Sequence, residues 1–150
     1  MKLGRDLTLR RIRSKGIGIF IEREFKKGEL VVRGRPVSKT KVRTDYSFQI
    51  GFNSHVELDE PARLINHSCD PNLGIRNNNL GGYDFVAIKQ IKPGEELGWD
   101  YCTTEYSSLV MKGSCLCGSK NCRSKIGGYI TLSQEQRERY REFIADYLKK

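Results

Sequence analysis

The stretch RLINHSCDPNLG, residues 63–74, sets an asparagine, a histidine, a serine and a cysteine side by side at positions 66 to 69. A second stretch, KGSCLCGSKNC at residues 112–122, holds three more cysteines in the spacing C-x-C-x4-C. Amide, imidazole and thiol groups are the side chains that bind ligands and metal ions. These two stretches are where the sequence points to chemistry.

Length and composition limit the class of protein. A chain of 150 residues fits one compact domain, and 37% hydrophobic with 30% charged residues describes a globular protein rather than a disordered one. No apolar run approaches the ~20 residues that cross a bilayer, and MKLGRDLTLR lacks the apolar core of a signal peptide. We therefore expect no membrane association and a cytoplasmic location, or a nuclear or nucleoid-associated one.

The net charge of +9 is unevenly distributed. Residues 1–43 hold 14 Lys and Arg against 4 Asp and Glu, whereas residues 44–150 hold 13 against 14. A basic segment of this kind can bind nucleic acid or an acidic partner. The simpler interpretation is a solvated basic surface, so that DNA contact through residues 1–43 is expected to be weak if it occurs.

Short strand-like segments recur between turn signals. They are GIGIFIE (16–22), ELVVRG (29–34), YSFQIGF (46–52), YDFVAI (83–88) and EELGWDY (95–101), with turns at KKG and KPG. In YSFQIGF the alternation predicts that Tyr46, Phe48, Ile50 and Phe52 share one face. The sequence predicts a mostly β, single-domain chain.

The C-terminus is the one convincing helix. Ser133 and Gln136 form a capping-box pattern at its start. An apolar stripe at i, i+3, i+4, i+7 and i+8 follows, made of Tyr140, Phe143, Ile144, Tyr147 and Leu148. These signals predict an amphipathic helix over residues 133–150, packed on the same domain.

The cysteines predict a metal site. The chain has five cysteines, an odd number that cannot all pair in disulfides. Three of them are clustered, and in a reducing compartment this favours a zinc site over disulfides or ordinary buried thiols. Cys115, Cys117 and Cys122 supply three ligands, and a structural zinc takes four. The fourth candidates are Cys69, Cys102, His55 and His67, among which spacing alone does not choose.

Several motifs together resemble one family. NHSCDPN (66–72), GEELGWDY (94–101) and the C-x-C-x4-C run occur with GIGIF (16–20) and YSF (46–48), in the order and at intervals similar to those of SET-domain protein-lysine methyltransferases with a post-SET zinc segment. The resemblance runs from about residue 6 to residue 126. It implies a SET domain at 6–107, a post-SET segment at 111–127, and a fold of several small sheets with a knot-like C-terminal threading.

The resemblance also implies a role for each motif. Cys69 becomes the fourth zinc ligand beside Cys115, Cys117 and Cys122, which leaves Cys102 a free thiol and His55 a surface residue. S-adenosylmethionine would be held by Lys15, Gly16, Ile17, Gly18, Tyr46, Asn66 and His67, with His67 not acting as a base. Tyr101 matches the catalytic tyrosine, and the lysine channel would be lined by Tyr46, Trp99 and Tyr101.

Three positions depart from the family pattern. Gly98 stands where threonine is usual, Trp99 where phenylalanine or tyrosine controls the number of methyl groups, and Ser124 where glycine is frequent. The number of methyl groups added is therefore left open. The implied function is methyl transfer to a lysine of a protein substrate, for which a basic, nucleic-acid-associated protein is one candidate. The alternatives are a catalytically silent, zinc-stabilised binding module on the same fold and a nucleic-acid-binding zinc protein.

Overall fold

The computed structural model describes residues 1–107 and 113–149 of the chain. Within these residues the chain forms ten short strands, one α-helix and four 3₁₀ segments. The strands are β1 Leu7–Ile12, β2 Gly16–Ile21, β3 Leu30–Arg33, β4 Pro36–Thr40, β5 Ser47–Gly51, β6 Ser54–Leu58, β7 Asn66–His67, β8 Leu73–Asn77, β9 Tyr83–Ala87 and β10 Gly98–Trp99. The helix is α1 Gln134–Tyr140, and the 3₁₀ segments are η1 Ala62–Leu64, η2 Tyr101–Thr103, η3 Tyr129–Thr131 and η4 Asp146–Leu148.

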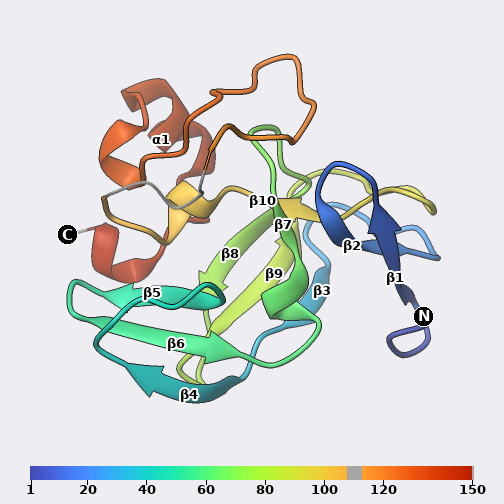
Figure 1. The fold of residues 1–150 in the computed structure, drawn as a ribbon, viewed down its shortest axis with the longest axis horizontal. Helices are drawn as coiled ribbons and strands as arrows, with labels where there is room; N and C mark the ends of the chain where they lie inside the picture. Colours follow the sequence, from blue (N-terminus) through green and yellow to red (C-terminus); the bar gives the residue numbers. More distant parts are fainter. Residues whose placement is uncertain (108–112, 150) are drawn as a thin grey trace.

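The strands form four small sheets (Figure 1). β1 and β2 make an antiparallel hairpin, and the two three-stranded sheets have the orders β3-β9-β8 and β4-β6-β5. The fourth sheet is the parallel pair β7 and β10, which lies near the middle of the view. A mostly β chain of several small sheets with one terminal helix confirms the predicted fold class.

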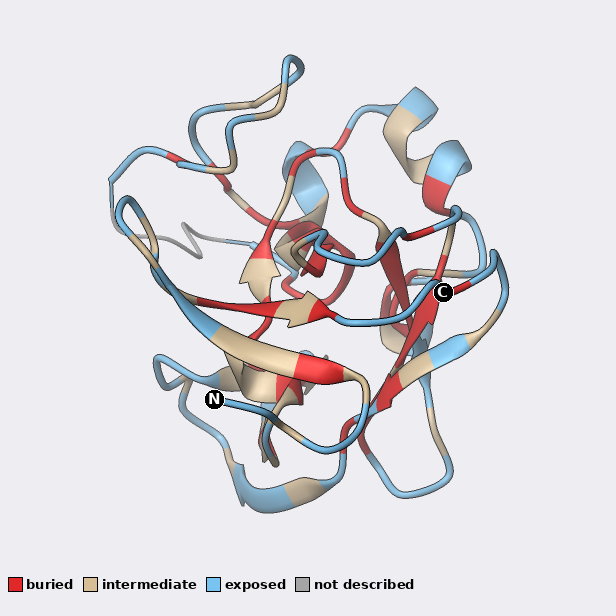
Figure 2. Cartoon of the chain, turned by 90° about the vertical axis from the view of Figure 1, so that its right-hand side faces the viewer, coloured by how far each residue is buried: buried red, intermediate tan, exposed pale blue. Residues whose placement is uncertain are grey.

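The core lies where these sheets meet (Figure 2). Ile19 and Ile21 of β2, Ile75 of β8 and Phe85 of β9 are fully buried, because alternate residues of each strand point to the same side. Phe48 of β5 packs edge-on against Phe85 at 6.0 Å and thereby joins two sheets. No helix in the described part of the chain is long and apolar enough to cross a membrane.

The prediction for residues 46–52 is wrong in part. Phe48 is buried, but the Tyr46 and Phe52 side chains are 50% and 59% exposed. The polar Gln49 is buried instead, since its backbone N–H donates to Glu105 Oε2 at 2.9 Å and its amide oxygen accepts from a backbone N–H at 2.8 Å. The burial of this segment therefore follows hydrogen bonds to Glu105 and Tyr106, which become neighbours only in the folded chain, and not the alternation of apolar residues.

The C-terminal helix begins as predicted but is shorter than 133–150. Ser133 and Gln136 form the capping box, and the helix ends after Tyr140, where Arg141 takes a φ of 42°. The chain then turns so that the Ala145 N–H donates to the Thr103 carbonyl at 2.8 Å, and a new turn forms at Asp146–Leu148. The helix therefore ends at Tyr140 because the residues after it pack against the rest of the domain instead.

The domain boundaries predicted from the sequence stay predictions. The predicted start of the post-SET segment at residue 111, and the final residue 150, lie outside the described residues. Within 113–127 the chain forms a loop without strands or helices, drawn in orange above β7 and β10 in Figure 1.

Candidate active site and metal centre

The parallel pairing of β7 with β10 assembles the site. Asn66 lies opposite Gly98 and His67 opposite Trp99, and the Ser68 N–H donates to the Trp99 carbonyl at 2.9 Å. Two motifs about 30 residues apart in the sequence thus run side by side.

A polar cluster lies on one side of this pair. Asn66 Nδ2 donates to the Ile17 carbonyl at 2.7 Å and to Glu96 Oε1 at 2.9 Å. Lys15 Nζ forms an ion pair with Glu96 Oε2 at 2.6 Å. A Cβ at Gly18 would lie 2.6 Å from Glu96 Oε1, so a larger residue there would displace the Glu96 side chain. Lys15, Ile17, Gly18 and Asn66 therefore converge around Glu96.

This cluster suits the amino-acid end of S-adenosylmethionine, which carries an ammonium and a carboxylate. The Lys15 and Glu96 side chains, 18% and 21% exposed, offer the complementary charges. Gly16 opens β2 beside them. Tyr46 does not belong to this cluster, and its ring lies under the Arg63 guanidinium at 4.8 Å. Glu96 does belong to it, although the sequence motifs did not single out this residue.

His67 lies between Tyr101 and Cys69, and its imidazole is neutral. Its Nδ1 accepts the Tyr101 N–H at 3.1 Å, which leaves the ring proton on Nε2, 3.3 Å from Cys69 Sγ. Burial lowers the pKa of His67 to about 4, against the opposing effect of Asp100. With both ring nitrogens engaged, His67 orients its neighbours and is not free to act as a base.

Tyr101 and Trp99 form an aromatic wall. Their rings lie 4.7 Å apart, and Trp99, only 4% exposed, stacks on Phe48 at 5.1 Å. Trp99 Nε1 donates to the Ile65 carbonyl at 3.2 Å, and the Tyr101 hydroxyl faces the same carbonyl at 3.4 Å. Burial raises the pKa of Tyr101 to about 12, so its hydroxyl stays protonated at neutral pH. The ring contacts of this wall do not include Tyr46.

The four predicted zinc ligands lie together. The sulfurs of Cys69, Cys115, Cys117 and Cys122 are all within 4.8 Å of one another. A tetrahedral zinc with Zn–S bonds of ~2.3 Å separates its sulfurs by roughly 3.8 Å, so the cluster fits that ion. Burial opposes ionisation of Cys117, yet hydrogen bonds led by that of Ser119 lower the pKa of this thiol to about 6. A closed four-cysteine site of this type is structural rather than catalytic.

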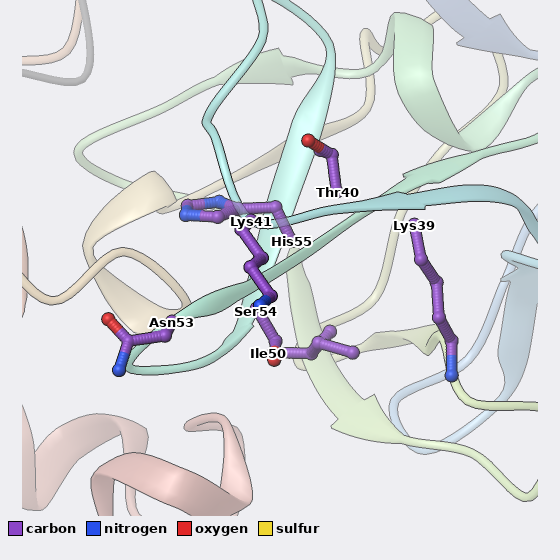
Figure 3. Close-up of a pocket in the computed structure, with 7 residues that line it drawn as sticks. All are labelled: Lys39, Thr40, Lys41, Ile50, Asn53, Ser54 and His55. Atoms are coloured by element: carbon purple, nitrogen blue, oxygen red, sulfur yellow. The ribbon is translucent and has the colours of Figure 1, made fainter.

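The other zinc candidates lie elsewhere. The Cys102 sulfur is buried 3.5 Å from an Arg123 nitrogen, outside the four-cysteine cluster. His55 is on β6, where it lines a cavity of about 410 Å³ with residues of β4, β5 and the β5–β6 turn (Figure 3). Apart from the zinc candidate His55, that cavity contains none of the residues predicted to bind cofactor, lysine or zinc.

A buried ionic group lies behind Tyr101. The Asp100 carboxylate accepts two hydrogen bonds from the Arg123 guanidinium, each 2.8 Å, and one from the Tyr140 hydroxyl at 2.6 Å. Burial alone would raise the pKa of Asp100, but the Arg123 hydrogen bonds and charge hold it below its usual value. The motif comparison missed Arg123 and Tyr140, although Asp100 directly precedes Tyr101 and Arg123 directly follows Cys122.

Two departures from the family pattern have local explanations. A Cβ at Gly98 would lie 2.9 Å from the Ser68 Cβ, so a larger residue there would push β10 away from the Asn66–Cys69 segment. Ser124 has a φ of 64°, the left-handed conformation in which glycine is preferred. The backbone thus keeps the conformation that a glycine would take, with a serine in it.

Comparison with known proteins identifies the family of the chain. Residues 16–102 match the family model described as SET domain. The chain is 29% identical over 138 residues to "Histone-lysine N-methyltransferase Set2" of Drosophila melanogaster, covering 79% of this chain and 6% of that protein. It is 37% identical over 75 residues to "Histone-lysine N-methyltransferase SETD2" of Homo sapiens, covering 48% of this chain and 3% of that protein.

A solved structure agrees with these relatives. The crystal structure of KRYPTONITE in complex with mCHH DNA, H3(1-15) peptide and SAH superposes with a TM-score of 0.63 at 26% identity. The match covers 83% of this chain and 30% of that one. The chain therefore spans a small part of the length of the proteins it resembles.

Proposed function

Because the chain belongs to the SET-domain family, we propose that it is a protein-lysine N-methyltransferase that uses S-adenosylmethionine as methyl donor. The observation that carries the proposal is the β7–β10 pairing, which places the Asn66 cluster on β7 next to Tyr101, the residue that opens η2 two positions after β10. The related proteins named as histone-lysine methyltransferases, and the related structure with SAH bound, support it.

The reaction depends more on alignment of the lysine amine with the methyl group than on acid–base catalysis. S-adenosylmethionine, when bound, supplies a methyl group on a positively charged sulfur. The lysine amine attacks only when neutral, and free lysine has a pKa of ~10.4. A channel walled by Trp99 and Tyr101 disfavours the ammonium form, since it offers aromatic carbon in place of water.

Tyr101 would orient the reacting groups. Its N–H is fixed by His67 and its ring by Trp99, so the hydroxyl is held at one place on the channel wall. With its pKa raised to about 12, the hydroxyl acts as a neutral hydrogen-bond partner rather than as a base. Lys15, Glu96 and Asn66 would bind the amino-acid end of the cofactor on the neighbouring side.

The four cysteines would fix the post-SET segment over this site. Cys69 lies three residues after Asn66, while the other ligands belong to the loop at 113–122. A zinc ion held by both segments would tie that loop to the cofactor-binding strand. The metal would then contribute to binding through structure and not through an open coordination position.

The substrate we propose is a basic, DNA-associated protein of the histone type. Relatives are named for histone lysines, and this chain adds a basic first third of its own. Arg10, Arg11 and Arg13 are exposed on the β1–β2 hairpin, where they could contact DNA phosphates beside the substrate. Such contacts would be weak and sensitive to salt.

The test is methyl transfer with labelled S-adenosylmethionine to lysate proteins, free histones and nucleosomes. We expect label on lysine, reduced at least about 100-fold by Tyr101→Phe, because the hydroxyl that aligns the reaction is removed. Cofactor affinity of that variant should stay within about twofold, since Tyr101 lies outside the Lys15–Glu96–Asn66 cluster.

The other outcomes separate the alternatives. Cofactor binding without transfer to any of these proteins would contradict the proposed substrate class. Neither cofactor binding nor transfer would contradict the enzyme and favour a zinc-stabilised binding module. A preference for nucleosomes over free histones that disappears with added salt would support DNA contact, and equal labelling at all salt concentrations would contradict it.

A further inference from the structure

Asp100 is the residue through which distant parts of the chain reach Tyr101. It is 1% exposed and caps η2, the 3₁₀ turn that begins with Tyr101, by accepting the Cys102 N–H at 3.0 Å. Its backbone carbonyl also accepts the Thr103 N–H at 3.0 Å. The orientation of this carboxylate therefore sets the start of the turn that carries Tyr101.

Arg123 holds the carboxylate from the side of the cysteine loop. The guanidinium donates to both Asp100 oxygens, and the Arg123 N–H donates to Cys69 Sγ at 3.4 Å. A planar guanidinium that meets a carboxylate at two points fixes both position and angle. One residue thus contacts the predicted zinc centre with its backbone and the base of the Tyr101 turn with its side chain.

Tyr140 holds the same carboxylate from the C-terminal helix. It is the last residue of α1, and its buried hydroxyl donates to Asp100 Oδ2 at 2.6 Å. Burial and the neighbouring Asp100 raise the pKa of Tyr140, so the hydroxyl keeps its proton. Helix α1 lies next to the orange loop in Figure 1, and the Tyr140 hydroxyl connects it to Asp100.

We propose that Tyr140 and Arg123 are positioning residues for Tyr101, acting through Asp100, so that helix α1 is part of the catalytic apparatus. This inference rests on the proposed methyltransferase function. It assigns to the C-terminal helix a role beyond covering the core: one hydroxyl and one guanidinium together fix the carboxylate that starts the Tyr101 turn.

The test compares Tyr140→Phe with Tyr129→Phe in the zinc-loaded chain. Both remove one hydroxyl at the α1 interface, but in the described part of the chain the Tyr129 hydroxyl has no hydrogen-bond partner, while its ring packs on Arg137 at 4.3 Å. The readouts are kcat and KM, cofactor affinity, zinc content, and quenching of the single tryptophan, Trp99, by acrylamide. Trp99 contacts the Tyr101 ring and reports its position without any turnover.

We expect Tyr140→Phe to keep its zinc and its cofactor affinity while kcat falls about 10-fold at unchanged KM, because small misplacements of a catalytic group are costly. Acrylamide quenching of Trp99 should increase in Tyr140→Phe and stay at the wild-type value in Tyr129→Phe. Arg123→Lys, which keeps the charge but loses the two-point contact, should lower kcat similarly. Adding Tyr140→Phe to it should then have less than its full effect, since both act on Asp100.

Indistinguishable kcat and Trp99 quenching in Tyr140→Phe and Tyr129→Phe would overturn the inference. So would a loss of thermal stability in Tyr140→Phe with kcat and quenching unchanged, because the hydroxyl would then serve the fold alone. If the wild type transfers no methyl group, the proposed function fails, and the quenching comparison still decides whether Tyr140 positions Tyr101.

Discussion

At the scale of single residues, protonation states decide what each group of the site can do. His67 is neutral, with one ring nitrogen facing the Tyr101 N–H and the other facing Cys69. Tyr101 keeps its proton because burial raises its pKa to about 12. Neither group is a suitable base near neutral pH, which leaves the substrate lysine to lose its proton to solvent.

This assignment predicts the pH dependence of the reaction. The logarithm of kcat/KM should rise with pH by about one per unit from pH 7 towards the lysine pKa, since the neutral amine is the nucleophile. Ionisation of Tyr101 should produce no fall in rate below about pH 12. The measurement is a rate profile between pH 7 and about 11, with circular dichroism at each pH to confirm the fold. A descending limb near pH 10, the ordinary tyrosine value, would contradict the raised pKa of Tyr101.

At the scale of secondary-structure elements, the loop at 113–127 depends on cysteine ligands because it contains no strand or helix of its own. Its cysteines meet Cys69 from the segment that follows β7, and Arg123 ties it to Asp100. A loop without strands or helices would gain order from metal binding, so that the binding energy of the ion would become folding energy of the segment.

The cysteines therefore predict a sharp contrast between two substitutions. Cys117→Ser should lower zinc affinity at least about 10-fold and lower the melting temperature, because one of four thiolate ligands is lost. Cys102→Ala also removes one thiol, but this thiol lies outside the four-cysteine cluster. The Cys102→Ala variant should therefore retain one zinc per chain. Zinc content measured by native mass spectrometry checks both. Equal zinc loss in the two variants would contradict the assignment of the ligands.

The same scale shows how much the sequence could predict. Spacing within one segment was sufficient for Cys115, Cys117 and Cys122, whereas Cys69 followed only from the resemblance to the SET family, and the structure brings all four sulfurs together. The Asp100–Arg123–Tyr140 group was not predictable in this way, since its members meet only after three segments fold together. The end of α1 was missed for the same reason: the apolar stripe continues past Arg141, and tertiary packing rather than periodicity turns the chain there.

At the scale of the whole molecule, one short segment connects the two centres. Asn66 contacts the Lys15–Glu96 cluster, His67 contacts Tyr101, and Cys69 belongs to the four-cysteine cluster. The segment pairs with β10 along one side, so it cannot shift at Cys69 without disturbing Asn66. Metal binding and cofactor binding should therefore be coupled in this chain, each favouring the conformation that suits the other.

The most direct measurement is calorimetric titration of S-adenosylmethionine into the zinc-loaded chain, into the chain after zinc removal by a chelator, and into the chain after zinc is restored. We expect one cofactor bound per zinc-loaded chain, an affinity at least about 10-fold weaker without zinc, and recovery when zinc returns. An affinity that is the same with and without zinc would contradict the coupling between the two centres. Absence of binding to the zinc-loaded chain would contradict the proposed enzyme itself.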